Sequence, residues 1–305
     1  MTRDKAHSRG TVLVLISAAA FGALAIFAKL AYAVGLTALT ALNWRFILAT
    51  LLMAAYLGLT GRSWRVKPRE ALTLLALGGL GYAAQSSLFF ASLRYIPASA
   101  TSMLLYTYPA LVSVLSFTLW RTPLGTRHLL ALLAAGAGTF LLLWSPSLHL
   151  NPAGTALGLG AALVYSFYLL ANQRLVRGVD AAVASAYIMA GTAVTFTLTN
   201  VVQGTFTCRL GPSAWLAVTL MAAISTNIAI VTLLAGIRYV GAEAASVLST
   251  FEPVVTVALS VLFLGERLSA PQTVGGLLIA SGVVLLHLPV RSRPAPGRPA
   301  SPVRA

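Results

Sequence analysis

Apolar residues occur along this chain in long runs that short polar stretches separate. A helix needs about 20 apolar residues to cross the hydrocarbon core of a bilayer, and ten runs approach that length. They are 11–33, 39–59, 70–92, 97–119, 127–144, 153–173, 182–202, 213–236, 242–264 and 272–288. The pattern therefore predicts an all-α integral membrane protein with ten transmembrane helices.

The second half of the chain repeats the first at an offset of 144 residues. Between 91–143 and 235–287, 15 of 53 aligned positions are identical, and the matches include Pro109 with Pro253. Self-similarity over most of a chain indicates two copies of one structural unit. Because five helices per copy is an odd number, the two copies must be inverted relative to each other in the membrane. Inverted repeats of this kind are typical of transporters.

The repeat and the runs divide the chain into five segments. They are a cytoplasmic N-terminal tail 1–10, a first five-helix repeat 11–144, a periplasmic link 145–152, a second five-helix repeat 153–288 and a disordered cytoplasmic C-terminal tail 289–305. The first run follows basic residues, as a signal peptide does, but it is longer than the usual 7–15 apolar residues. We expect it to remain as a helix, since it has a repeat mate at 153–173.

The charge is strongly positive and unevenly placed. The net charge is +15, and 16 of the 21 basic residues fall in segments that the ten-helix pattern places on one side of the membrane. The positive-inside rule makes that side the cytoplasm and puts both termini there. Anionic lipid headgroups account for such a charge without a nucleic-acid partner. We therefore expect a multi-pass protein of the bacterial cytoplasmic membrane.

Two prolines lie near the middle of the fourth and ninth runs, at matching places in the repeats. Pro109 and Pro253 each lack an N–H and clash with the carbonyl four residues back, at Leu105 and Ser249. A carbonyl freed at membrane depth persists only where protein or a water-filled cavity satisfies it. The matched prolines predict hinges beside a central cavity, although proline also kinks membrane helices without any functional role.

Glu252 is an acid deep within the ninth run, directly before Pro253. An unpaired charge in hydrocarbon costs several kcal/mol, so this side chain is protonated, paired or in contact with water. It is either a proton site or substrate contact, or a structural acid bonded to a neighbouring helix. Its repeat mate is Tyr108, so any proton chemistry is asymmetric.

Other polar side chains fall deep enough in the runs to face a cavity. A tyrosine hydroxyl in the membrane needs a partner and therefore tends to point inward. The candidate cavity residues are Tyr82, Gln85, Tyr106, Tyr108, Tyr165, Tyr168, Asn227 and Glu252. The alternative is hydrogen bonding between helices with no ligand.

Lys29, Asn43 and Arg45 lie near the outer ends of the first and second runs. They could form an outer vestibule that suits a carboxylate-bearing substrate. Long basic side chains near helix ends also extend to the interface without any such role. Both interpretations remain open at this stage.

The sequence contains no pattern of an enzyme active site. It has no phosphate-binding loop, no paired metal ligands and no nucleophile triad, and the single Cys208 excludes an internal disulfide. We predict no catalytic residues, metal or cofactor. A lipid-modifying membrane enzyme and a non-transporting scaffold are the weaker alternatives.

Two segments resemble the EamA-type carriers of the drug/metabolite transporter superfamily. The closer match combines Ser249-Thr250-Phe251-Glu252-Pro253 with Leu264-Gly265-Glu266-Arg267 and Gly275-Gly276. The first half matches through Arg94-Tyr95-Ile96-Pro97 and Tyr106-Thr107-Tyr108-Pro109, but Arg121-Thr122 replaces Gly265-Glu266 there. The resemblance implies ten helices, cytoplasmic termini and export of small metabolites.

The expected function is therefore secondary transport. The chain would export small metabolites, amino acids first among them, by alternating access through a central cavity. Export of drugs or other metabolites and passive facilitation are the alternatives, and protons are a candidate partner. The coupling ion, the substrate and the oligomeric state are not determined by the sequence.

Overall fold

The computed structural model describes residues 3–121, 125–143, 151–176, 178–241, 245 and 248–287. Every regular element in these residues is a helix. Most of the predicted link 145–152 and the whole of the predicted tail 289–305 lie outside the described residues.

The helices of the first half run from α1 to α8. They are α1 (Arg3–Gly22), α2 (Leu24–Ala33), α3 (Ala38–Leu59), α4 (Pro68–Ala76), the π-helix η1 (Leu77–Tyr82), α5 (Ala83–Ser92), α6 (Ala98–Leu105), α7 (Tyr108–Trp120) and α8 (Thr126–Leu143). The second half contains α9 (Pro152–Leu175), α10 (Ala181–Val202), α11 (Pro212–Ala222), the π-helix η2 (Ala223–Ile228), α12 (Ala229–Val240), α14 (Phe251–Leu264) and α15 (Ala270–His287).

Seven stretches of the described residues are long and apolar enough to cross a membrane. They are His7–Ala33, Ala38–Leu59, Pro68–Ser92, Ala98–Leu119, Pro152–Leu175, Ala181–Val202 and Pro212–Val240. The three remaining predicted runs contain shorter apolar helices, at His128–Leu141, Phe251–Leu264 and Ala270–Leu285. The all-helical membrane fold is thus confirmed, and seven of the ten predicted spans have full length.

Local sequence explains where several of these helices begin. Thr37, Asn151 and Asp180 each stand at an N-cap and accept hydrogen bonds from main-chain N–H groups of the first turn. Short polar side chains at this position satisfy donors that have no partner within the helix. Pro152 and Pro212 occupy the first turn of α9 and α11, where the missing N–H costs nothing.

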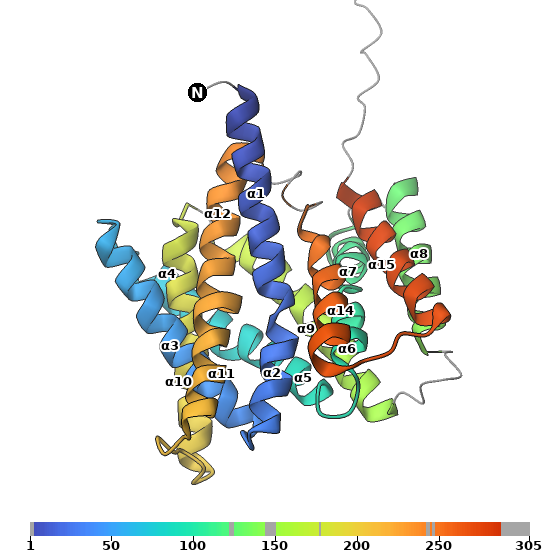
Figure 1. Cartoon of the computed structure of the whole chain (residues 1–305). Helices are drawn as coiled ribbons and strands as arrows, with labels where there is room; N and C mark the ends of the chain where they lie inside the picture. The colour runs from blue at the N-terminus through green and yellow to red at the C-terminus, as the bar shows by residue number, and fades with distance from the viewer. Residues whose placement is uncertain are drawn as a thin grey trace, which may run out of the picture.

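The packing of the helices reproduces the internal repeat. In Figure 1, α1 lies beside α12. The repeat mate of α1 is α9, which packs against α5. Two further pairs of helices join the halves, α3 with α10 and α8 with α15. The correspondence extends to single residues. A Cβ atom added to Gly10 would lie 2.6 Å from Cβ of Tyr239, and one added to Gly154 would lie 2.6 Å from Cβ of Tyr95. The 144-residue offset relates these two contacts, so the repeat is also a symmetry of the structure.

Two π-helical segments, η1 and η2, occur at matching places in the two halves. A π-turn leaves carbonyl groups without their usual helical donors. At η1, the hydroxyl of Thr192 donates to the Gly78 carbonyl at 2.9 Å and that of Thr195 to the Gly79 carbonyl at 3.0 Å. At η2, Asn227 donates to the Ala222 carbonyl at 2.9 Å. Side chains therefore satisfy the backbone at depths where lipid cannot.

The two matched prolines stand just after interruptions in their helices. Between α6 and α7, Tyr106 and Thr107 leave the helical path, and Pro109 occupies the first turn of α7. In the second half α14 starts at Phe251, with Pro253 in its first turn. The sequence predicted a bend, and the structure shows a short interruption of the helix just before each proline, while Ala98–Leu119 still forms one stretch long enough to cross a membrane.

Candidate functional site

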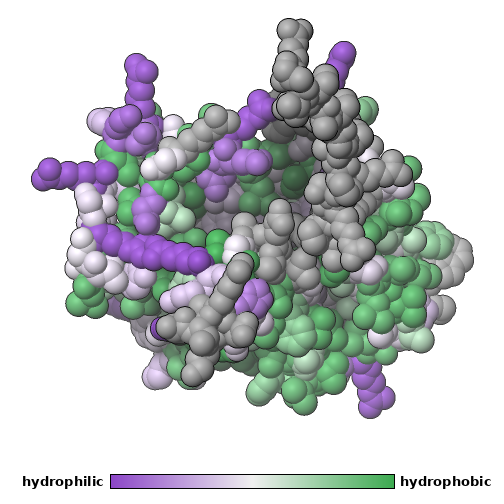
Figure 2. Space-filling view, turned by 90° about the horizontal axis from the view of Figure 1, so that it is seen from above, coloured by the Kyte–Doolittle hydropathy of each residue, from purple (hydrophilic) through white to green (hydrophobic). Residues whose placement is uncertain are grey.

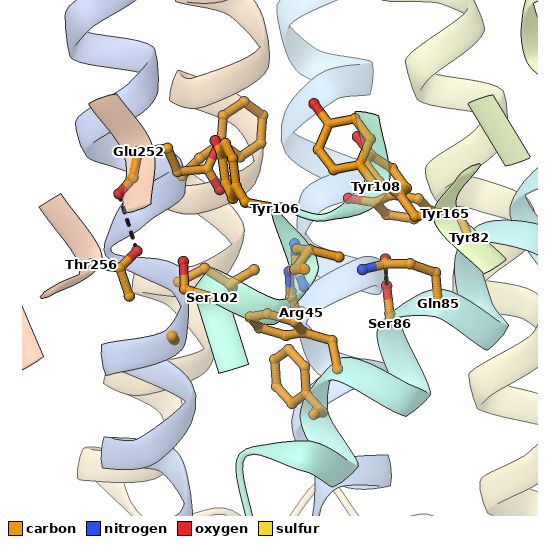
Figure 3. Close-up of a pocket in the computed structure, with 16 residues that line it drawn as sticks. Arg45, Tyr82, Gln85, Ser86, Ser102, Tyr106, Tyr108, Tyr165, Glu252 and Thr256 are labelled. Carbon is orange, nitrogen blue, oxygen red and sulfur yellow. Dashed lines mark hydrogen bonds between the residues drawn. The ribbon is translucent and has the colours of Figure 1, made fainter. Parts of the chain in front are cut away.

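A cavity of about 110 Å³ lies among helices of both halves. Its polar wall consists of Arg45, Tyr82, Gln85, Ser86, Ser102, Tyr106, Tyr108, Tyr165, Glu252 and Thr256, all of which Figure 3 labels. Seen from the side of the molecule where α1 begins, the surface is hollowed near its middle (Figure 2). A space of this size holds several water molecules or one small solute.

Interrupted helices from both repeats meet at this cavity. Phe21 and Leu24 flank the break between α1 and α2, Tyr106 lies in the break between α6 and α7, and Glu252 lies in the first turn of α14. The hydroxyl of Thr256, on α14, donates to the Gly22 carbonyl beside the interruption between α1 and α2 at 2.9 Å. Irregular backbone at membrane depth is expected where it lines a cavity.

Glu252 forms one wall of the cavity together with Tyr106. The Tyr106 hydroxyl lies 2.7 Å from Oε2 of Glu252 and 3.0 Å from the main-chain oxygen of Ser249. Ser249 is the residue whose carbonyl Pro253 was expected to leave free. A tyrosine of the first repeat therefore contacts both the acid and the freed carbonyl of the second.

Arg45 enters the cavity from α3 on another side (Figure 3). Its side chain is only 2% exposed. Nε donates to the hydroxyl of Thr226 at 3.1 Å, and the guanidinium carbon lies 4.7 Å from the ring centroid of Phe46. The sequence placed Arg45 near an outer vestibule, whereas the structure places it in the central cavity.

Five tyrosines form a continuous aromatic wall. Tyr108 and Tyr165 have ring centroids 4.9 Å apart, Tyr106 lies 6.0 Å from Tyr108, and Tyr165 stacks on Tyr168 at 5.9 Å. Tyr82 closes the group at 5.4 Å from Tyr168. Tyr168 supports the wall from behind and does not reach the cavity. The rings come from both repeats, so the wall exists only when the two halves are packed together.

The structure brings most, but not all, of the predicted cavity residues together. Tyr82, Gln85, Tyr106, Tyr108, Tyr165 and Glu252 line the cavity. Asn227 does not, because its amide nitrogen donates to the main chain of η2 and to the Ala49 carbonyl at 3.2 Å. Pro109 and Pro253 are buried behind the wall and do not line it either.

The residues predicted for an outer vestibule are separated. Asn43 is buried and accepts a hydrogen bond from Thr197 on α10 at 2.8 Å. Lys29 lines a separate pocket with Tyr32 and Arg94, and its ammonium group donates to the Ile96 carbonyl at 3.0 Å. Lys29 therefore joins α2 to the segment before α6, and the three residues do not form a common vestibule.

A second set of contacts joins the two repeats at the end of the molecule to which Lys29 belongs. One carboxylate oxygen of Glu266 accepts from the Ala98 N–H at 2.6 Å; the other accepts from the hydroxyl of Ser99 at 2.6 Å and from its N–H. The carboxylate thus caps the N-terminus of α6 from the opposite repeat. We call the contacts of Lys29 and Glu266 the outer seal. The sequence indicated Glu266 only as part of a family motif, since a cap across repeats has no local signature.

The described residues contain no group of three or more His, Cys, Asp or Glu side chains that could hold a metal ion. The polar wall instead combines one carboxyl group, one guanidinium and several hydroxyl groups. This set can bind a small polar solute and hold a proton.

Comparisons with known proteins agree with this architecture. A chain of known crystal structure superposes with a TM-score of 0.60 over 92% of this chain and 96% of its own length, at 24% identity, which shows a shared fold. An uncharacterized inner membrane transporter of Salmonella typhimurium, YicL, is 28% identical over 74% of this chain and 76% of its own length. An uncharacterized transporter of Bacillus subtilis, YcbK, is 28% identical over 87% of this chain and 88% of its own.

The sequence pattern of one family matches both repeats. The EamA-like transporter family covers residues 8–144 and again residues 152–288, two matches separated by the 144-residue offset. Together they include nearly all of the helices described above. The chain belongs to the EamA-like transporter family.

Proposed function

We propose that this protein is a secondary transporter that exports small metabolites, amino acids first among them, across the bacterial cytoplasmic membrane by alternating access. The observation that carries the proposal is the central cavity, where interrupted helices of two symmetry-related halves surround an ionisable side chain. Transporters built from inverted repeats bind substrate at the repeat interface beside discontinuous helices.

The chemistry of the wall supports amino acids among the possible substrates. The Glu252 carboxylate and the faces of Tyr106, Tyr108 and Tyr165 provide negative charge and π-systems, both of which attract an ammonium group. The carboxyl, guanidinium and hydroxyl groups of the wall favour a polar solute over the apolar compounds that multidrug exporters carry. A passive facilitator remains the alternative, and a pH gradient separates the two.

Transport in proteoliposomes tests the proposal. Purified protein should catalyse saturable uptake of labelled amino acids above the level of protein-free vesicles, and an imposed pH gradient should drive accumulation. Because a facilitator only equilibrates its substrate, accumulation against a concentration gradient would identify proton coupling. No uptake of any of the 20 common amino acids above the protein-free level would contradict the amino-acid assignment.

We further propose ten membrane-spanning helices with both termini in the cytoplasm. Of the three shorter helices, α14 packs against α1 and α6, and α8 and α15 pack chiefly against each other and also contact α7, which supports their placement in the same layer. The arrangement puts the outer seal on the periplasmic face and the hollow of Figure 2 on the cytoplasmic face.

The single cysteine offers a test of this topology. Cys208 is exposed and lies between α10 and α11, on the proposed periplasmic side. In spheroplasts a membrane-impermeant maleimide should label Cys208 of the unmodified protein. In a Cys208→Ser background, Arg65→Cys, in the exposed loop before α4, should react only after permeabilisation. The reverse labelling pattern would place the termini outside the cytoplasm.

A further inference from the structure

Arg45 is a buried cation that lines the cavity without a counter-ion among the described residues. The side chain is 2% exposed, and its hydrogen-bond acceptor Thr226 and the nearby Tyr82 are uncharged. The rings of Phe46 and Phe90 lie 4.7 Å and 5.8 Å from its guanidinium carbon. Aromatic faces and hydroxyl groups lower the cost of burying a guanidinium, but they do not neutralise it.

Each carboxylate that the structure describes is engaged elsewhere. Glu70 lies 3.9 Å from Lys67, and Asp180 pairs with Arg62 at 3.0 Å. Glu266 caps α6, and Glu252 contacts Tyr106. No described acid forms an ion pair with Arg45; Glu252 lines the same cavity but contacts Tyr106. Burial of an isolated charge is unfavourable unless an ion or ligand compensates it.

The geometry leaves the guanidinium able to bind a ligand. A guanidinium carries five N–H donors in a planar fork. Thr226 accepts from Nε, and even with the nearby Tyr82 hydroxyl as a second acceptor further N–H groups remain for a molecule in the cavity that Arg45 lines. Arginine forks match carboxylates through two parallel hydrogen bonds.

We propose that Arg45 binds the carboxylate of the transported solute and so restricts this carrier to small carboxylate-bearing molecules. The proposal rests on the transport function above and specifies its substrate class. Arg45 is the one cationic side chain of the described cavity wall, so a single negative charge is what the wall can neutralise. A phosphate monoester, with close to two charges, would leave one uncompensated. Glu252 and the tyrosine rings lie across the cavity for an ammonium group, which favours zwitterions over simple acids.

Ligand-dependent thermal unfolding of the purified full-length protein tests this proposal with three related probes. L-Leucine carries both charges, 4-methylpentanoate carries only the carboxylate, and 3-methylbutylamine carries only the ammonium group. In the wild type, leucine should raise the unfolding temperature most, 4-methylpentanoate less, and the amine not at all. The same unfolding measurement with the other common amino acids in place of leucine extends the test to side chains that fit the cavity better.

Two arginine substitutions supply the matched comparison. Arg45→Met keeps the length of the side chain and removes its charge, and it should weaken carboxylate binding by about 10- to 100-fold, the loss expected for a hydrogen bond to a charged group. Arg94→Met, at an exposed residue of the outer pocket, should bind as the wild type does. Without ligand, Arg45→Met should unfold at the wild-type temperature or above, because it removes an uncompensated charge, whereas a purely structural arginine would predict a lower temperature.

Several outcomes would overturn the assignment of Arg45. They are equal protection of wild type and Arg45→Met, equal protection by amine and amino acid, or no protection by any carboxylate. If Arg45→Met does not fold, Arg45→Lys, which keeps the charge without the fork, provides the same comparison. Saturable transport of solutes that lack a carboxylate would refute the role of Arg45 while leaving the transport function in place.

Discussion

Replacing Glu252 with glutamine is expected to abolish transport driven by a pH gradient and to leave the protein folded. The Tyr106 hydroxyl reaches both Oε2 of Glu252 and the Ser249 carbonyl. A hydroxyl has a single proton and donates to one acceptor at a time. Both contacts can therefore be hydrogen bonds together only when Glu252 is protonated and donates to the tyrosine oxygen.

This arrangement links the protonation of Glu252 to the break at the start of α14. When Glu252 is ionised, it competes with Ser249 for the Tyr106 proton, and the carbonyl next to the break loses its donor. Glutamine keeps the shape and can donate permanently, so Glu252→Gln holds the arrangement in its protonated form. Gradient-driven accumulation should fall to the level of protein-free vesicles, whereas counterflow exchange, which needs no net proton movement, should persist.

A second acid provides the control for this experiment. Glu70 lies outside the cavity, in the first turn of α4, and contacts Lys67. Glu70→Gln should transport as the wild type does in both assays. Wild-type accumulation by Glu252→Gln would exclude this carboxyl group as the proton site and leave it a structural role.

The largest effect on folding is expected at the contact between η1 and α10. A Cβ atom added to Gly78 would collide with the main-chain oxygen of Ile188, and one added to Gly191 would collide with that of Leu75. The obstacle in both cases is backbone, which cannot rotate away as a side chain can. Gly78→Ala and Gly191→Ala should each destabilise the protein by about 1–3 kcal/mol or more, the usual cost of overpacking.

Thermal unfolding in detergent and the yield of folded protein measure this effect. Gly78→Ala should also lengthen the hydrogen bond from Thr192 to the Gly78 carbonyl. Gly58→Ala is the matched control, since a Cβ atom at Gly58 meets nothing within 4 Å and alanine favours the helix of which Gly58 is part. Similar unfolding temperatures for Gly58→Ala and Gly78→Ala would show that η1 and α10 are not in backbone contact.

Hydropathy and self-similarity were sufficient to predict an all-helical membrane protein built from two repeats. The thickness of the bilayer fixes the length of a membrane-spanning helix, and the offset between the repeats can be found by aligning the sequence with itself. The same reasoning identified Glu252 and Tyr106, because a carboxyl or phenol group in hydrocarbon requires a partner. It placed Asn227 in the cavity incorrectly, since a polar side chain at that depth can equally satisfy its own helix, as Asn227 does at η2.

The remaining features depend on three-dimensional packing. The π-helical segments have no composition of their own; at η1, Gly78 and Gly191 allow two backbones to approach closely. Arg45 lies about two turns from the start of α3, a position from which its long side chain could reach either the membrane surface or the interior. Only the packing of Phe46 and Phe90 around the side chain directs it inward. The position of Arg45 in the sequence therefore predicted how far along its helix the residue lies, but not the direction in which its side chain points.

The outer seal has a consequence for how the protein rests between transport cycles. A shift of 144 residues carries Glu266 onto Thr122, an uncharged residue outside the described part of the chain, so the acid that caps α6 has no equivalent in the other repeat. Two identical halves would make the inward-open and outward-open states equal in free energy. Each free-energy difference of about 1.4 kcal/mol between the inward-open and outward-open states changes the ratio of their populations tenfold. In the orientation and export direction proposed above, an unmatched lock on the periplasmic face would favour the state of the unloaded carrier that opens to the cytoplasm, the side from which it would collect its cargo.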